Sequence, residues 1–343
     1  MKSQASLRSK AKEKSVTQRD LPMIELHRHL EGCMRPQTIL ELGEKHARPL
    51  AEDLEGVRAL LQVTEPQPGL MPFILRLERA VSILGDLDAC ARVALECVED
   101  ASREGLAYLE LRFSPYFMAM SWQLDLAEVV NAVADGVRRG ERNFGLRTNL
   151  IGIMSRTFGP QTAMRELQAL LTHRDKLVAL DLAGDEARWP GEHFVEHFRI
   201  GRKAGWHINV HAGEAAGPAG IWQAVNVLGA ERLGHAVHAG ADPALISYLG
   251  EHKIGIESCL TSNVQTKTVT DYSHHPIRSF LEQGQLATIN TDNPTASGVT
   301  LPYELSIAAP AAGLNTELIH QAKMNALTVA FLSNEDKAIL QRQ

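Results

Sequence analysis

The sequence lacks a run of apolar residues long enough to cross a bilayer. No early segment joins a charged start to the apolar stretch of a secretory signal. Its four cysteines are scattered and form no C-x-x-C pair, so we expect neither a disulfide framework nor a cysteine-type zinc site. These absences predict a cytoplasmic protein without a membrane partner.

Negative charge exceeds positive charge outside the first twenty residues. The 343 residues carry a net charge of −6, but residues 1–20 hold six Lys and Arg against two Asp and Glu, a local charge of +4 that leaves about −10 for the rest. Nucleic-acid binding depends on clustered Lys and Arg, so the acidic body argues against such a partner. Residues 1–20 are polar and lack aromatic residues. We expect a disordered basic extension there, with contact to RNA or a membrane surface as the alternative.

Eight short apolar runs alternate with helical patterns along residues 21–343, without an internal break in composition. The expected strands are Met23–Leu30, Tyr108–Phe113, Asn149–Met154, Leu177–Leu182, His207–Val210, Arg232–Val237, Ile254–Ser258 and Leu286–Asn290. Strands separated by helices pair in parallel, and eight of them predict a single α/β domain, a closed (β/α)8 TIM-type barrel. An open doubly wound sheet would also alternate, but it usually carries a Gly-rich phosphate turn where this chain has Gly32 alone. The long segment between the first two strands predicts extra helices over the C-terminal mouth.

Polar residues gather where the expected strands end, which is where barrels of this type hold their active sites. These residues are His27 and His29 on the first strand, Asp181 to Glu186 after the fourth, His211 and Glu214 after the fifth, His235 on the sixth, and Asp292 and Asn293 after the eighth. Because side chains alternate along a strand, two histidines at i and i+2 project to the same side. Imidazole is a common zinc ligand, so a metal site would explain several of these residues together.

Each of these residues also has a purely structural interpretation. His27 and His29 could be surface histidines on an edge strand, and His211 or His235 a buried, hydrogen-bonded imidazole. Glu214 could favour the start of the next helix through its charge. Gly184 could permit a tight turn, and Asp292-Asn293-Pro294 is a turn sequence. Taken jointly, these residues fill one site with three histidine ligands, a carboxylate ligand, a carboxylate acid/base and a further imidazole. We therefore favour the joint interpretation.

From about Leu21 to the C-terminus the sequence resembles the adenosine deaminase family, and most closely its bacterial members. The matching segments are His27–Gly32, Ile151–Phe158, Leu180–Glu186, His211–Ala216, Gly234-His235, Ile256–Asn263 and Thr291-Asp292. The zinc deaminases that act on bases in nucleic acids carry H-x-E with P-C-x-x-C instead, and no such cysteine pair exists here. The resemblance implies hydrolytic deamination of adenosine and 2′-deoxyadenosine to inosine and 2′-deoxyinosine plus ammonia, as in purine salvage.

The resemblance also implies one zinc ion per chain. The implied ligands are His27, His29, His211 and Asp292, with water completing the shell. A two-metal amidohydrolase is a competing interpretation, but such enzymes usually bridge their metals with a modified lysine at the end of strand four. Here that strand ends in Asp181 and Gly184. One metal is therefore expected.

The resemblance further assigns roles around the substrate, a small purine nucleoside. Glu214 would carry a proton to purine N1, His235 would orient and stabilise the attacking hydroxide, and Asp292 would accept a hydrogen bond from the water. The implied substrate contacts are His29, Glu31, the backbone N–H of Gly184 at purine N3, and Asn293. General acid–base help of the kind expected from Glu214 is worth about 10²–10⁴-fold in rate.

Three positions depart from the family pattern. Glu31 stands where the bacterial adenosine enzymes usually have Asp, at the position that meets the ribose 5′-hydroxyl, and related adenine deaminases tend to carry Glu there. Asn293 replaces the second Asp of an Asp-Asp pair, so an amide donor would meet N7 in place of a carboxyl group. Ala236 replaces a glycine. An adenine deaminase and a non-enzymatic relative are therefore the alternatives that remain.

Overall fold

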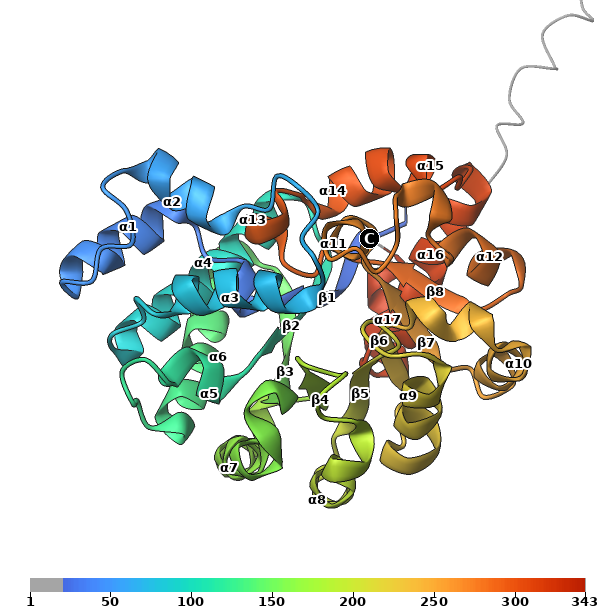
Figure 1. The fold of residues 1–343 in the computed structure, drawn as a ribbon, viewed down its shortest axis with the longest axis horizontal. Coiled ribbons are helices and arrows are strands. Elements are labelled where there is room, and N and C mark those ends of the chain that lie inside the picture. Colours follow the sequence, from blue (N-terminus) through green and yellow to red (C-terminus); the bar gives the residue numbers. More distant parts are fainter. Residues whose placement is uncertain (1–20, 343) are drawn as a thin grey trace, which may run out of the picture.

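The fold is an eight-stranded parallel barrel surrounded by helices, as the sequence predicted (Figure 1). The computed structural model describes residues 21–342, so the extension expected over residues 1–20 lies outside the described residues. The strands pair in chain order from β1 to β8. Their bounds are β1 Ile24–His29, β2 Tyr108–Phe113, β3 Arg147–Ser155, β4 Ala179–Ala183, β5 His207–Ala212, β6 Arg232–His235, β7 Gly255–Ser258 and β8 Leu286–Ile289.

The barrel closes between β1 and the segment that follows β8. The backbone N–H of His29 donates to the carbonyl of Asp292 at 2.8 Å, and the N–H of Asp292 donates to the carbonyl of His27 at 2.8 Å. These two hydrogen bonds continue the parallel pairing beyond the last residue of β8. Closure therefore joins the two sequence segments, far apart in the chain, that carry three of the expected metal ligands.

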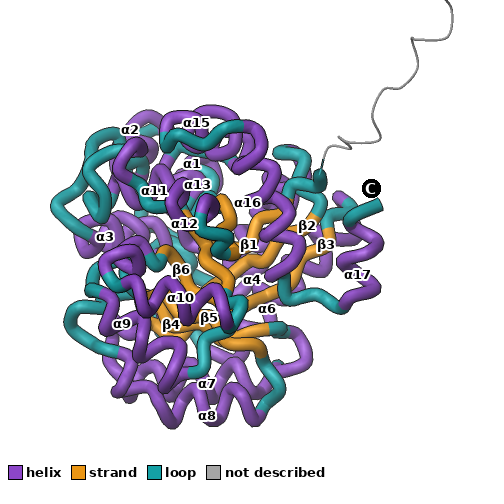
Figure 2. Tube along the Cα trace, turned by 90° about the vertical axis from the view of Figure 1, so that its right-hand side faces the viewer, coloured by secondary structure: helices purple, strands orange, loops and turns teal. Residues whose placement is uncertain are grey.

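The helices that follow the strands form the outer layer, and Figure 2 shows the strands enclosed by them. The longer helices are α1 Pro36–Lys45, α2 Leu54–Leu61, α3 Leu70–Val81, α4 Leu87–Arg103, α6 Leu126–Phe144, α7 Gly159–Thr172, α8 Val195–Lys203, α10 Pro243–Glu251, α16 Thr316–Val329 and α17 Asn334–Leu340. The shorter ones include α5 Pro115–Ala119, α9 Pro218–Gln223, α11 Leu260–Gln265, α12 Ile277–Glu282, α13 Pro294–Ser297, α14 Leu301–Tyr303 and α15 Ala309–Ala311. Among residues 21–342 no helix combines the length and apolar character needed to span a membrane.

Extra helices precede β2, and one of them covers the barrel mouth. Helix α3 places Leu70, Phe73, Ile74 and Leu77, at helical spacing, along the wall of the pocket at the C-terminal ends of the strands. Helices α1 and α2 extend outward from the same side of the molecule (Figure 1). The predicted covering of the mouth is therefore made by α3.

Strand β6 is shorter than the sequence predicted, ending at His235 and not at Val237. His235 and Ala236 have φ angles of +64° and +47°, so the chain leaves the extended conformation there. L-residues adopt this left-handed region at a cost. The sharp turn directs the His235 ring into the barrel mouth, where it lines the pocket.

Candidate active site

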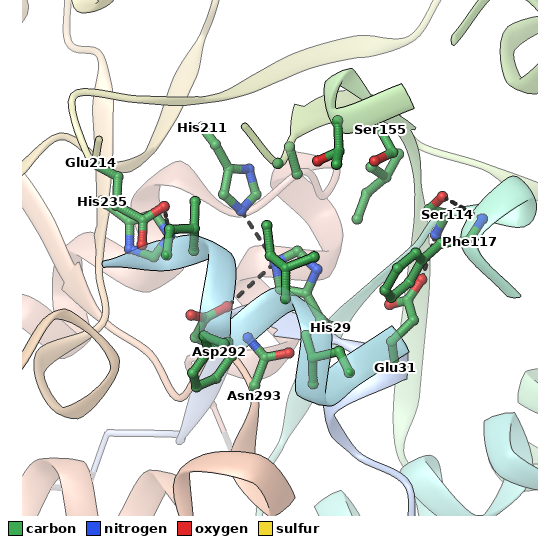
Figure 3. A pocket seen from close by; sticks show the side chains of 18 residues that line it. His29, Glu31, Ser114, Phe117, Ser155, His211, Glu214, His235, Asp292 and Asn293 are labelled. Atoms are coloured by element: carbon green, nitrogen blue, oxygen red, sulfur yellow. Dashed lines mark hydrogen bonds and ion pairs between the residues drawn. The ribbon is translucent and has the colours of Figure 1, made fainter. Parts of the chain in front are cut away.

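A pocket at the C-terminal ends of the strands contains nearly all of the residues singled out in the sequence. It is lined by His29, Glu31, Gly184, His211, Glu214, His235, Asp292 and Asn293, together with apolar residues of α3 and residues following β2 and β3. Figure 3 shows His29, His211, Glu214, His235, Asp292 and Asn293 gathered around the pocket, with Glu31 beside Ser114 at its other side. His27 lies beneath them, fully buried.

The four expected metal ligands converge on one point. Nε2 of His29 lies 3.1 Å from Nε2 of His211. Oδ1 of Asp292 lies 3.3 Å from Nε2 of His29 and 3.4 Å from Nε2 of His27. The ring nitrogens of the three histidines lie within 4.8 Å of one another. Three imidazole nitrogens and a carboxylate oxygen that lie this close together can bind one cation jointly.

The outer nitrogens of two of these histidines are held by buried carboxylates. Nδ1 of His27 lies 2.7 Å from Glu257, and Nδ1 of His211 lies 3.1 Å from Asp181. A carboxylate partner places the hydrogen on Nδ1 and leaves the Nε2 lone pair free for a metal. Nε2 of His27 is buried and has no hydrogen-bond partner. The donor set of three imidazoles and one carboxylate therefore fits a zinc ion.

Sequence reasoning missed the supports behind these ligands. Arg112 contacts Asp181 at 2.7 Å and Glu257 at 2.8 Å, and Arg232 also contacts Glu257. Burial alone would raise the pKa of Glu257, but the two guanidinium groups outweigh it and hold that pKa below its usual range. Both arginines lie on strands, at positions that alternate into the barrel interior. The available signal was the presence of charged residues within these short strands: Glu110 and Arg112 on β2, Arg232 on β6 and Glu257 on β7.

Asp292 is oriented by its neighbours. Its φ angle is +63°, and Oγ of Ser262 donates to Oδ2 at 2.6 Å. One carboxylate oxygen is thus bound by Ser262, while the other faces the histidines. The Ser262 contact was also missed, although Ile256–Asn263 belonged to the matching segments.

Glu214 and His235 face each other on one wall of the pocket, with Oε2 of Glu214 3.6 Å from Nε2 of His235. Burial, together with the nearby charges of Asp292 and Glu186, raises the pKa of Glu214 to about 8. A carboxyl group with a pKa in this range holds its proton at neutral pH and can give it to a substrate. The geometry is that of a buried acid beside a candidate metal centre.

The loop that carries Glu214 is held by another buried carboxylate, that of Glu186. The backbone N–H groups of residues 213 to 216 all donate to Glu186, at distances of 2.8, 3.1, 3.0 and 3.0 Å. On the other side, Nη2 of Arg156 donates to the carbonyl of His211 at 2.7 Å. The sequence placed Glu186 among the polar strand ends, but only the structure reveals that it binds the loop backbone.

Replacing Glu186 with Gln is expected to lower the free energy of unfolding by roughly 1.5–3 kcal/mol, the scale of hydrogen bonds to a charged group. The Gln amide group offers only one acceptor oxygen to four N–H groups, so the Glu214 loop loosens and kcat should fall at least about 10-fold. Thermal unfolding and steady-state kinetics would measure both. Glu231→Gln is the matched control, because Glu231 accepts the N–H of Ile208 at the opposite end of β5 and is half-exposed. Equal effects of the two variants would contradict this role.

Glu31 and Asn293 also line the pocket, Glu31 beside Ser114 and Asn293 beside Asp292 (Figure 3). Oε1 of Glu31 accepts the N–H of Ser114 at 2.7 Å, whereas Oε2 is buried without a partner, and burial raises the pKa of this carboxyl to about 7. Oδ1 of Asn293 is also buried without a partner and packs against Gly32, where a Cβ atom would lie 2.0 Å away. Both side chains therefore have unused hydrogen-bonding atoms.

Gly184 lies at the end of β4 with a φ angle of +106°. A Cβ atom here would lie 2.2 Å from Oγ1 of Thr157, so glycine is required both for the backbone conformation and for the close packing. The residue lines the pocket, as do Asp292 and Asn293.

Comparison with known proteins places this arrangement in a family. The sequence model described as adenosine deaminase matches residues 22–343. An adenosine deaminase from Escherichia coli O1:K1 is 56% identical over 324 residues, 94% of this chain and 97% of that protein. The adenine deaminase structure from Arthrobacter aurescens is 25% identical, with a TM-score of 0.87 over 94% of this chain and 97% of that one. The N6-methyl-AMP deaminase of Arabidopsis thaliana, 24% identical with a TM-score of 0.80 over 94% of this chain and 95% of that one, shares the fold. The chain therefore belongs to the adenosine deaminase family.

Proposed function

We propose that this protein is a zinc-dependent hydrolase that converts adenosine and 2′-deoxyadenosine to inosine and 2′-deoxyinosine, releasing ammonia. The supporting observation is the position of Glu214 and His235 beside the point on which His27, His29, His211 and Asp292 converge. Membership of the family and the 56% identity to a named adenosine deaminase agree with this activity. A role in purine salvage and a cytoplasmic location are part of the same proposal.

The donor set supports zinc and one ion per chain. Three imidazoles and one carboxylate suit a borderline-soft cation. A two-metal enzyme would have a bridging lysine at the end of β4, whereas this strand contains no lysine and is followed by Gly184. When bound, a zinc ion lowers the pKa of a coordinated water to roughly 7 and so supplies a nucleophile at neutral pH.

Glu214 handles the protons of the reaction. As the nucleophile adds to C6 of the purine, the ring nitrogen N1 gains electron density, and the buried carboxyl group of Glu214 gives its proton to N1. Burial keeps that proton available at neutral pH, because it raises the pKa of the group to about 8. Glu214, now a carboxylate, takes the proton of the hydroxyl group added at C6 and passes it to the amino group. The C6–N bond then breaks, ammonia leaves, and the 6-oxo product remains. His235, on the same wall, orients the nucleophile, and Asp292 accepts its hydrogen bond.

The remaining polar groups bind the rest of the substrate. The backbone N–H of Gly184 meets purine N3, and the amide of Asn293 donates to N7 without needing a proton of its own. The unpartnered Oε2 of Glu31 accepts the ribose 5′-hydroxyl. His29 borders the reacting carbon. The apolar wall of α3 excludes water from the purine ring.

Adenine is the second candidate substrate, because the adenine deaminase of Arthrobacter aurescens has nearly the same fold and Glu31 departs from the usual aspartate. The test is a substrate panel on the zinc-loaded protein, comparing ammonia release from adenosine, 2′-deoxyadenosine and adenine. We expect a kcat/KM for the two nucleosides at least about 10²-fold above that for adenine, since hydrogen-bonding groups left unpaired by the missing ribose cost binding of the transition state. Turnover of adenine alone would overturn the nucleoside assignment. A zinc-loaded protein with no turnover of any of the three would indicate a non-enzymatic relative.

A further inference from the structure

Behind His235, a chain of hydrogen bonds links the active site to a backbone amide on the outer layer. It runs through Asn263 in α11 and His275 between η7 (Tyr272–His274) and α12. All three side chains are buried. The function proposed above does not depend on these hydrogen bonds. For each of them, the donor and the acceptor can be assigned.

The hydrogen bond farthest from the active site, between Ile277 and His275, fixes which atoms donate along the chain of hydrogen bonds. The backbone N–H of Ile277 donates to Nδ1 of His275 at 3.1 Å. A backbone amide is always a donor, so Nδ1 of His275 must be an acceptor without a hydrogen. Burial lowers the pKa of His275 to about 3, so the ring is neutral. Its single hydrogen therefore lies on Nε2.

The next links follow from this one. Nε2 of His275 lies 3.1 Å from Oδ1 of Asn263, and because it carries a hydrogen, the amide oxygen is the acceptor. The amide nitrogen of Asn263 then lies toward His235, 3.1 Å from Nδ1 of that ring. An amide nitrogen is only a donor, so Nδ1 of His235 is an acceptor as well.

We infer that Asn263 and His275 are positioning residues that hold His235 as the neutral tautomer with its hydrogen on Nε2. The ring then presents an N–H donor to the pocket, 3.6 Å from Oε2 of Glu214. This inference rests on the proposed function and deepens it. His235 stabilises charge on the attacking oxygen, but it has no free nitrogen with which to take a proton. Proton transfer is left to Glu214.

The substitution Asn263→Asp tests this without changing the shape of the side chain. A carboxylate can still accept the hydrogen of His275, but it cannot donate to His235. The hydrogen of His235 would then move to Nδ1. A wrong tautomer of a catalytic histidine can cost up to about 10⁴ in kcat, and we expect a loss of at least about 10²-fold with KM changed less than about 3-fold. Asn131→Asp is the matched control: Asn131 lies in α6 and accepts from Lys176, so this variant should keep wild-type kinetics.

The tautomer itself is read by nitrogen NMR of the zinc-loaded protein labelled with ¹⁵N in histidine. The signals of His235 are those missing from a His235→Gln variant. We expect the wild type to show an unprotonated Nδ1 and a protonated Nε2, and Asn263→Asp to show the reverse. A wild-type protein with a protonated Nδ1 would overturn the inference, as would full kcat in Asn263→Asp. If Asn263→Asp does not fold, the wild-type spectrum alone decides.

The same measurements separate this inference from the proposed function. The NMR result needs no substrate. A protein that shows the expected tautomer but releases no ammonia from adenosine would refute the proposed function and leave the tautomer assignment standing. A protein that deaminates adenosine with a protonated Nδ1 on His235 would refute the tautomer assignment and leave the proposed function standing.

Discussion

Replacing Glu214 with Gln is expected to lower kcat for adenosine at least about 10²-fold, and up to about 10⁴-fold, while the metal stays bound. The Gln side chain has nearly the same shape but cannot give a proton to N1 or pass one to the departing amine. Glu214 is not among the side chains that converge on the metal position, so metal content should be unchanged. Steady-state ammonia release and metal analysis on the same sample would measure the two effects.

The comparison variant is again Glu231→Gln, the same substitution at the opposite end of β5. It keeps an acceptor oxygen for the N–H of Ile208 and removes the negative charge beside His207 at a half-exposed site. Its kcat should remain within about 3-fold of wild type, as expected for a site far from the chemistry. Unchanged kcat in Glu214→Gln would remove Glu214 from the mechanism, whereas loss of zinc in that variant would mean that Glu214 helps to hold the metal.

The positions of the site residues along the fold could be predicted because a barrel converts sequence periodicity into geometry. His27 and His29 are two residues apart on β1 and point to the same side, and parallel strands deliver all of their C-terminal ends to one mouth. His211 and Asp292 follow β5 and β8 and therefore reach the same place. His211 comes within 3.1 Å of His29, and Asp292 within 3.3 and 3.4 Å of His29 and His27. The alternation of side chains along a strand and the order of parallel strands were therefore sufficient to predict where these residues lie.

The residues behind the site could not be predicted, because their roles depend on contacts between distant strands. Arg112 reads in the sequence as an ordinary charged residue on an alternating strand, yet it is completely buried and joins Asp181 to Glu257. Which partners it meets is set by strand register and rotamer. His275 gives even less signal, since it follows another histidine in a loop and contacts the site only through Asn263.

Removing the metal, or one of its ligands, is expected to lower kcat more than Glu214→Gln does. A bound metal ion supplies the nucleophile and stabilises the charge that develops in the transition state, which together lower the activation free energy by several kcal/mol. His211→Ala should therefore lower kcat by at least about 10³-fold. Chelation of the wild type should do the same, and adding zinc back should restore activity only in the wild type. The matched variant is His207→Ala, a half-exposed histidine at the other end of β5.

The same substitution also tests whether four side chains share one ion. Oδ1 of Asp292 lies 3.4 Å from Nε2 of His27 and 3.3 Å from Nε2 of His29, which lies 3.1 Å from Nε2 of His211. A cation that binds among these atoms binds only the folded chain and should therefore stabilise it. Thermal unfolding of the wild type is therefore expected to shift upward on adding zinc, while His211→Ala should respond much less. If His211→Ala bound one zinc ion per chain as tightly as the wild type, His211 would not be a ligand, and the convergence of the four side chains would need another explanation.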